Sequence, residues 1–193
     1  MATPDPLLSD SLRARLARVR LIVLDVDGTL TDGTVTYTDD GRELKSFHIH
    51  DGIGMVLCGF VGVRIAWITG RKSVMVERRA QELGVTHLYQ KIRDKATALA
   101  EIALREGVSP EEMAFMGDDL IDLPAFRNVG VAIAPGDAVP EVRAAAHLVT
   151  VRDGGRGAAR EAIEAILRAR GDYDAALGAY LLSLSQPRAN TGQ

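Results

Sequence analysis

The sequence predicts an α/β protein with a Rossmann-like parallel sheet and helices on both faces. Four continuous apolar runs support this prediction, at residues 21–24, 63–68, 113–116 and 129–133. Continuous runs without polar alternation are typical of strands that are covered on both faces. Helical patterns lie between the runs, and such alternation indicates a parallel sheet with right-handed crossovers.

The first element is an expected amphipathic helix over residues 9–19, with Ser9 or Asp10 as its N-cap. The first strand follows it directly. Further helices are predicted, in chain order, at residues 53–60, 73–83, 94–106, 120–127 and 158–170. The last helix follows a Gly-Gly-Arg-Gly loop at 154–157, which predicts either an anion site at the helix N-terminus or a tight turn.

One segment interrupts the alternation of strands and helices. Residues 34–38 are β-prone, Asp39-Asp40-Gly41 is a turn signal, and residues 43–49 again resemble a strand. We therefore expect a β-hairpin over residues 33–50, inserted directly after the first strand and too short to be a domain. Residues 171–193 are expected to form a C-terminal tail.

Length and composition fit one soluble globular domain spanning residues 1–193. The chain is 47% hydrophobic and 25% charged, with a net charge of −3. This mild acidity argues against nucleic acid or an anionic membrane as the main partner. The N-terminal residues lack a signal-peptide pattern, and no run reaches the roughly 18 apolar residues that span a bilayer. Cys58 is the only cysteine, which suits a reducing cytoplasm.

Polar residues follow three of the predicted strands. Asp25 and Asp27 follow the first run, Thr69 follows the second, and Asp118 follows the third, while Lys95 opens a helix between the last two strands. Ligands bind at the carboxyl ends of strands in such sheets, so these side chains are expected to converge.

The expected cluster suits phosphoryl transfer. Converging carboxylates favour a hard divalent cation such as Mg²⁺, and a carboxylate beside it can attack phosphorus. Lys95 would balance the remaining negative charge, and the Thr69 hydroxyl would hold phosphoryl oxygens. Asp27, two residues after Asp25, could protonate the leaving oxygen and later activate water. A lone Asp at a strand end is usually a helix cap or a turn residue, and a lone Thr-Gly or Asp-Lys pair carries almost no information, so the prediction depends on the combination.

The motifs resemble those of the haloacid dehalogenase superfamily. The matching segments are Asp25-Val26-Asp27-Gly28-Thr29, Ile68-Thr69-Gly70-Arg71, Lys95 and Gly117-Asp118-Asp119. The resemblance implies Asp25 as nucleophile and Asp27 as general acid/base, with Thr69 and Lys95 holding phosphate. It also implies Mg²⁺ binding by Asp25, the backbone carbonyl of Asp27 and Asp118, with support from Asp119.

A closer resemblance, over about residues 20–170, is to the 3-deoxy-D-manno-octulosonate 8-phosphate phosphatase family. It rests on Leu30-Thr31-Asp32-Gly33, Asp51-Gly52, Ile68-Thr69-Gly70-Arg71-Lys72-Ser73, His87-Leu88-Tyr89-Gln90, Gly117-Asp118-Asp119-Leu120-Ile121-Asp122 and Gly154-Gly155-Arg156-Gly157. The resemblance implies action on a sugar-acid phosphate that is a lipopolysaccharide precursor. It also implies a homotetramer without a cap domain, in which the hairpin of one subunit covers the site of its neighbour.

The chain departs from that family at His50, where the family has an arginine before Asp51-Gly52. Arginine is a permanent forked cation, whereas histidine is largely neutral at pH 7, so the identity of the sugar acid stays open. Together, the motifs and the resemblance give the expected substrate contacts as Asp27, Thr69, Gly70, Arg71, Lys95 and His50. The alternatives are a nine-carbon sugar-acid 9-phosphate as substrate, a phospho-accepting receiver module, and an inactive scaffold.

Overall fold

A six-stranded parallel sheet forms the centre of the protein. The structure is a computed structural model, and it describes residues 9–185. The strand order is β5-β4-β1-β6-β7-β8, and every neighbouring pair is parallel. The strands are β1 (Leu21–Leu24), β4 (Arg64–Ile68), β5 (His87–Tyr89), β6 (Met113–Met116), β7 (Val131–Ala134) and β8 (Leu148–Val149). The predicted Rossmann-like α/β fold is confirmed.

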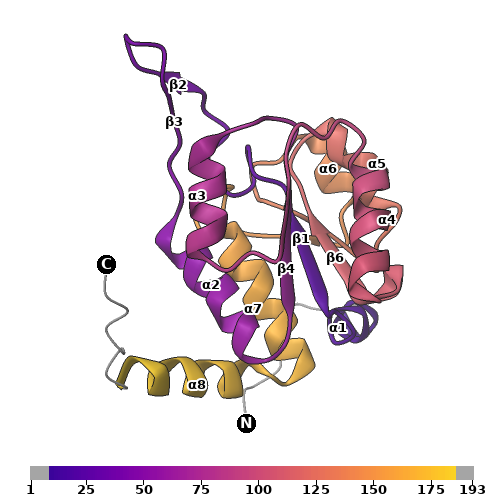
Figure 1. The fold of residues 1–193 in the computed structure, drawn as a ribbon. Coiled ribbons are helices and arrows are strands. Elements are labelled where there is room, and N and C mark those ends of the chain that lie inside the picture. Colours follow the sequence, from indigo (N-terminus) through magenta and orange to yellow (C-terminus); the bar gives the residue numbers. More distant parts are fainter. Residues whose placement is uncertain (1–8, 186–193) are drawn as a thin grey trace.

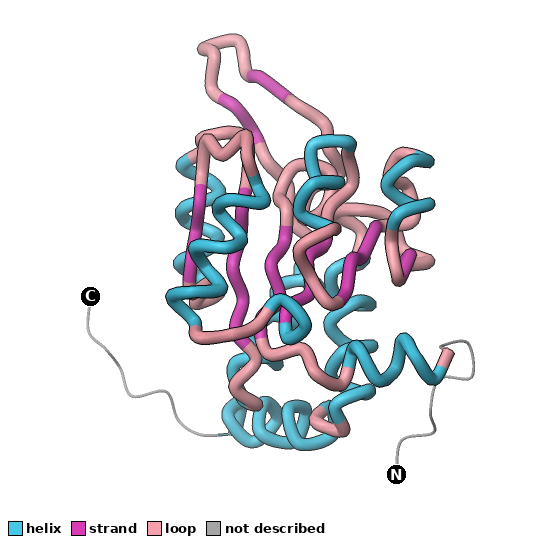
Figure 2. Tube along the Cα trace, turned by 90° about the vertical axis from the view of Figure 1, so that its right-hand side faces the viewer, coloured by secondary structure: helices cyan, strands magenta, loops and turns pink. Residues whose placement is uncertain are grey.

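Helices cover both faces of the sheet (Figures 1 and 2). One face packs against α1 (Asp10–Leu16), α2 (Ile49–Phe60), α3 (Val74–Glu82), α7 (Ala158–Arg170) and α8 (Tyr173–Ser185). The other face packs against α4 (Lys95–Glu106), α5 (Leu123–Phe126) and α6 (Pro140–Ala145). The 3-10 turns η1 (Pro110–Glu112) and η2 (Leu120–Asp122) flank β6. Within residues 9–185, no helix has both the length and the hydropathy that crossing a bilayer requires.

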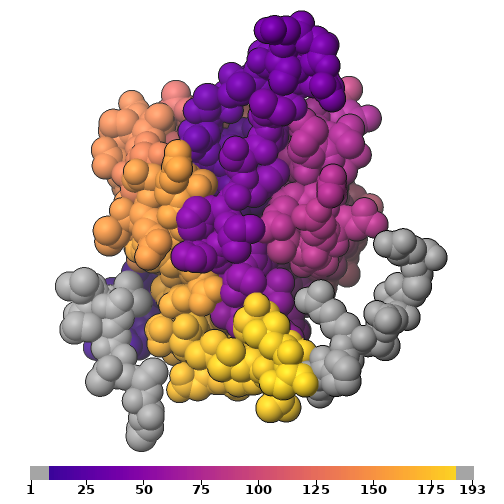
Figure 3. Space-filling model, turned by 90° about the vertical axis from the view of Figure 1, so that its left-hand side faces the viewer, coloured from indigo at the N-terminus to yellow at the C-terminus, as the bar shows by residue number. Residues whose placement is uncertain are grey.

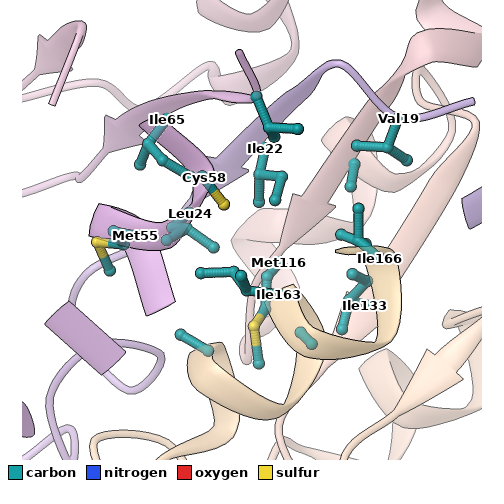
Figure 4. Packing of buried hydrophobic residues seen from close by; sticks show 14 of the residues in the cluster. Val19, Ile22, Leu24, Met55, Cys58, Ile65, Met116, Ile133, Ile163 and Ile166 are labelled. Atoms are coloured by element: carbon teal, nitrogen blue, oxygen red, sulfur yellow. The ribbon is translucent and has the colours of Figure 1, made fainter. Parts of the chain in front are cut away.

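Strand β1 is buried on both sides, which explains its continuous apolar run. Ile22 and Leu24 belong to the core under α2 and α7, whereas Leu21 and Val23 belong to the core under α4 and α5. Figure 4 shows Ile22 and Leu24 among side chains from the helices of the first face, such as Ile163. All four β1 side chains are fully buried.

The position of β1 defines the functional edge of the sheet. After β1 the chain builds β4 and β5 on one side, and then crosses to build β6, β7 and β8 on the other. Strand order therefore reverses at β1, and the carboxyl ends of β1, β4 and β6 lie next to one another. This is the switch point at which ligands bind in open α/β sheets.

The hairpin after β1 projects away from the body of the protein (Figures 1 and 3). Its strands β2 (Thr36–Tyr37) and β3 (Glu43–Leu44) are antiparallel, with Thr36 opposite Leu44. Val35, Tyr37 and Leu44 are exposed on it. The predicted hairpin exists, but its regular part is short.

The expected strand over residues 43–49 is wrong at its end. The pairing stops at Leu44, and α2 already begins at Ile49, four residues before the expected start of that helix. His48 is the extended N-cap of α2, and His50 lies in its first turn. Asp51, also in the first turn, is favourable at this helix end.

Short elements account for the other differences. The helix expected at residues 120–127 is divided into η2 and α5, since Asp119 and Asp122 form a capping box at the 3-10 turn. Strands β5 and β8 and helix α6 were not predicted, because two to six residues carry little periodicity. Most of the tail 171–193 forms α8, and residues 186–193 of that predicted tail lie outside the described residues.

The Gly-rich loop at 154–157 packs backbone against backbone beneath the loop that follows β1. A Cβ on Gly154 would lie 1.7 Å from the carbonyl oxygen of Gly28, and one on Gly155 would lie 2.4 Å from the carbonyl carbon of Thr31. The Gly155 N–H donates to the Thr29 carbonyl at 3.0 Å. These glycines therefore allow close support of the segment that carries Asp25 and Asp27.

Substitution of Gly154 by Ala should destabilise the protein by about 3 kcal/mol, because the clash is with backbone that cannot rotate away. Urea unfolding would measure this loss. Gly178→Ala is the matched control, since nothing lies within 4 Å of its Cβ position in α8, and it should gain roughly 0.5–1 kcal/mol. Equal stability of the two variants would contradict the packing described.

Candidate active site

Three acidic side chains meet at the switch point of the sheet. Asp25 follows β1, Asp118 follows β6, and Asp122 closes η2. One carboxylate oxygen from each of the three lies within 4.8 Å of the others. The predicted convergence of Asp25 and Asp118 is therefore observed, and Asp122 joins them.

Lys95 is the cation of this cluster. Its ammonium donates to Oδ1 of Asp25 at 2.5 Å and to Oδ1 of Asp122 at 2.6 Å, and its side chain is only 3% exposed. Burial alone lowers the pKa of Lys95, but the two carboxylates together outweigh it and raise that pKa above its usual value. Lys95 is therefore charged and is held between two carboxylates at the start of α4.

Asp122 orients the loop after β6. Its Oδ2 accepts the backbone N–H groups of Asp118 at 3.0 Å and Asp119 at 3.2 Å, while its Oδ1 accepts Lys95. Gly117 makes room for it, since a Cβ there would lie 2.4 Å from the Asp122 carboxyl carbon. Asp122 was missed as a site residue, although its spacing after Gly117-Asp118-Asp119 was visible.

The supporting role that the resemblance implied for Asp119 stays a prediction. Asp119 is exposed, and as the N-cap of η2 its carboxylate accepts the Leu120 N–H at 2.7 Å. Asp118 instead accepts the hydroxyl of buried Thr29 at 2.9 Å. Gly28, with a φ of +96°, packs against Asp118, where a Cβ would lie 2.0 Å from Oδ2.

The charge balance of the cluster fits a divalent cation. Burial raises the pKa of Asp25 well above its usual value, with Lys95 opposing it in part, and burial raises the pKa of Asp118 to about 6. With all three carboxylates ionised, the one ammonium leaves two negative charges in a largely buried cluster, and this repulsion is relieved by either protons or a cation. A hard dication such as Mg²⁺, which takes oxygen ligands, would neutralise them. Asp25 and Asp118 are the side chains that suit it best, because Asp122 already accepts three hydrogen bonds, from Lys95 and from two backbone N–H groups.

Asp27 lies at the rim, with both carboxylate oxygens held. Oδ2 accepts the Thr69 hydroxyl at 2.9 Å, and Oδ1 accepts the ammonium of Lys45, which comes from the hairpin. Its side chain is 25% exposed, whereas that of Lys45 is 3% exposed. Lys45 was also missed, because the sequence around it gave only a strand signal.

Gly70 and Arg71 follow Thr69 on the loop after β4. The Arg71 N–H donates to the Thr69 hydroxyl at 3.1 Å, and the Arg71 guanidinium pairs with Glu43 of the hairpin at 2.5 Å. These two residues therefore lie on the strand-end loop that carries Thr69. Their predicted contact with substrate stays a prediction.

His50 lies apart from this cluster. It is exposed in the first turn of α2 and lines an open groove of about 500 Å³ beside α7. The other lining residues are Val151, Arg152, Arg160, Glu161 and Glu164. A role for His50 toward the substrate also stays a prediction.

A family model for haloacid dehalogenase-like hydrolases matches residues 80–160. The chain is 41% identical over 171 residues to the 3-deoxy-D-manno-octulosonate 8-phosphate phosphatase of Escherichia coli, covering 89% of this chain and 91% of that protein.

Solved structures agree with the sequence comparisons. The crystal structure of the same type of phosphatase from Yersinia pestis has a TM-score of 0.85 at 41% identity, covering 86% of this chain and 90% of that one. The enzyme from Moraxella catarrhalis, solved with a magnesium ion, a phosphate ion and a KDO molecule, has a TM-score of 0.84 at 39% identity. That match covers 87% of this chain and 97% of the other.

Mg²⁺ should raise the thermal stability of the protein, because it neutralises a buried negative cluster that exists only in the folded state. At a free concentration of 100 times Kd the gain is about 2.7 kcal/mol. Calorimetry with and without Mg²⁺ would measure it. Asp118→Asn should lose most of the gain, whereas the matched Asp119→Asn, which keeps a capping side chain, should retain it. A full gain in Asp118→Asn would contradict this site.

Proposed function

Because the chain belongs to the 3-deoxy-D-manno-octulosonate 8-phosphate phosphatase family of haloacid dehalogenase-like hydrolases, we propose that it hydrolyses the phosphate ester of that eight-carbon sugar acid. The reaction is Mg²⁺-dependent and supplies lipopolysaccharide biosynthesis. The observation that carries the proposal is the buried carboxylate of Asp25, held by Lys95 and placed beside Asp118.

Asp25 is the nucleophile. Lys95 holds its Oδ1, which fixes the direction of the carboxylate at the end of β1. A carboxylate oxygen of Asp25 attacks phosphorus and forms an aspartyl phosphate, while the bond from phosphorus to the sugar oxygen breaks. Bound Mg²⁺ supplies positive charge that offsets the repulsion between the carboxylate and the phosphoryl group.

Asp27 is the general acid and base. As the acid it gives its proton to the leaving sugar oxygen, which departs as a hydroxyl group. As the base it then takes a proton from water, and the hydroxide attacks the aspartyl phosphate to release inorganic phosphate and free Asp25. Its place two residues beyond Asp25, at the exposed rim, suits contact with the leaving group and with water.

The remaining roles follow from charge and placement. Thr69 and Lys95 act with Asp25 and Asp27 as the catalytic set, and they donate hydrogen bonds to the phosphoryl oxygens. Asp25, the backbone carbonyl of Asp27 and Asp118 bind Mg²⁺. The proposed substrate contacts are Asp27, Thr69, Gly70, Arg71, Lys95 and His50.

The hairpin supports a homotetramer without a cap domain. It projects from the body and exposes Val35, Tyr37 and Leu44, which suits burial against another copy (Figure 3). We propose that residues 1–193 form one phosphatase domain, with the hairpin at 33–50 and the tail at 171–193. The buried free thiol of Cys58 suits work in the reducing cytoplasm.

A panel of sugar phosphates assayed with Mg²⁺ tests the proposal. 3-Deoxy-D-manno-octulosonate 8-phosphate should give the highest kcat/KM, and Asp25→Asn should lose at least about a thousandfold in kcat because its amide is a poor nucleophile. A circular-dichroism spectrum would confirm that the variant is folded.

Two outcomes would overturn this function. A higher kcat/KM for the nine-carbon sugar-acid 9-phosphate would assign another substrate, in line with His50 replacing arginine. A phosphorylated Asp25 that lasts minutes to hours in protein with Asp27 intact would indicate a receiver module, since Asp27 would then not be promoting hydrolysis.

A further inference from the structure

Lys45 is a buried cation that the reaction as described does not use. It comes from the hairpin, and its ammonium forms an ion pair with Oδ1 of Asp27. The side chain is 3% exposed, although the neighbouring hairpin residues Leu44 and Ser46 are exposed. The hairpin thus directs one long side chain inward, to the carboxylate proposed as acid and base.

The contact belongs to a closed ring of interactions among five residues, which are Asp27, Lys45, Glu43, Arg71 and Thr69. Lys45 lies 3.7 Å from Glu43, and Glu43 pairs with Arg71 at 2.5 Å. The backbone N–H of Arg71 donates to the hydroxyl of Thr69 at 3.1 Å, and that hydroxyl donates to Oδ2 of Asp27 at 2.9 Å. The ring therefore joins the hairpin, the loop after β4 and the loop after β1.

We propose that Lys45 is a positioning residue for the Asp27 carboxylate in both halves of the reaction, an inference that rests on the proposed function. Thr69 holds one oxygen of Asp27 and Lys45 holds the other. When the Thr69 hydroxyl turns to the phosphoryl group, Lys45 is the donor that stays on the Asp27 carboxylate. A misplacement of about 1 Å in a catalytic group can cost about a hundredfold in rate.

The geometry favours positioning over substrate binding. The ammonium of Lys45 is already paired with Asp27 and Glu43, and its side chain is nearly inaccessible. A carboxylate of the substrate would have to displace Asp27 from it. An uncompensated buried charge is costly, so Lys45 should stay in place through the reaction, with Glu43 as its counter-charge while Asp27 carries the proton.

The two roles predict different kinetics. A positioning role affects kcat for every substrate, including p-nitrophenyl phosphate, which carries no carboxylate. The leaving p-nitrophenolate needs little protonation, so the aspartyl phosphate still forms while its hydrolysis by the Asp27-activated water slows. A substrate-binding role instead affects KM, and only for the sugar acid.

Lys45→Met should lower kcat roughly 30- to 100-fold for both substrates, with KM changed less than about threefold. Phosphorylated Asp25, measured by mass spectrometry after acid quench, should accumulate with p-nitrophenyl phosphate. Lys45→Gln serves as a second variant should the Met variant lose its fold, and Lys45→Arg should recover most of kcat. Arg20→Met is the matched control, because it removes the cation of the Arg20–Glu112 pair at the opposite end of β1.

The inference is overturned if kcat is unchanged, or if only KM for the sugar acid rises. It is equally overturned if Lys45→Met and Arg20→Met show the same loss of activity and the same decrease in melting temperature, because that would indicate a general effect on stability. Failure of the proposed function looks different, because the unsubstituted protein would then release no phosphate from either substrate.

Discussion

The ammonium of Lys95 is the contact on which the rest of the site depends. It lies in the core between Asp25 and Asp122, at the end of a side chain that extends from the first turn of α4. Without it, the clustered carboxylates of Asp25, Asp118 and Asp122 would repel one another with nothing in the contacts described to offset them. With it, two negative charges remain, which is the charge that a divalent ion neutralises. The cluster is therefore suited to a divalent cation.

Topology explains why these groups meet. Strand order reverses at β1, so the loops that follow β4, β1 and β6 begin at the same edge of the sheet. A different set of contacts stabilises each loop. Asp122 bonds the backbone after β6, Gly154 and Gly155 support the segment after β1, and the ring through Lys45 links the loop after β4 to the hairpin. The hairpin thus has two proposed uses, to hold Asp27 in its own chain and to contact another copy.

The sequence predicted the groups that end strands, because buried parallel strands have a strong signal and their ends share one edge. Asp25, Asp118 and Lys95 meet as expected for that reason. Asp122 and Lys45 were missed because their side chains contact residues that are distant in the sequence, and hydrophobic periodicity does not indicate such contacts. The early start of α2 was missed because residues 43–49 intersperse Leu44, Phe47 and Ile49 with polar residues, which resembles a strand, although the pairing of β3 ends at Leu44.

The most direct test of this account is to locate the phosphoryl group during turnover. The enzyme would be quenched in acid while it hydrolyses its substrate, digested, and mapped by mass spectrometry. We expect the phosphoryl group on Asp25, beside Lys95 at the end of β1. A phosphoryl group on another residue, or steady turnover with no phosphorylated residue at all, would contradict the claim that this carboxylate captures phosphorus.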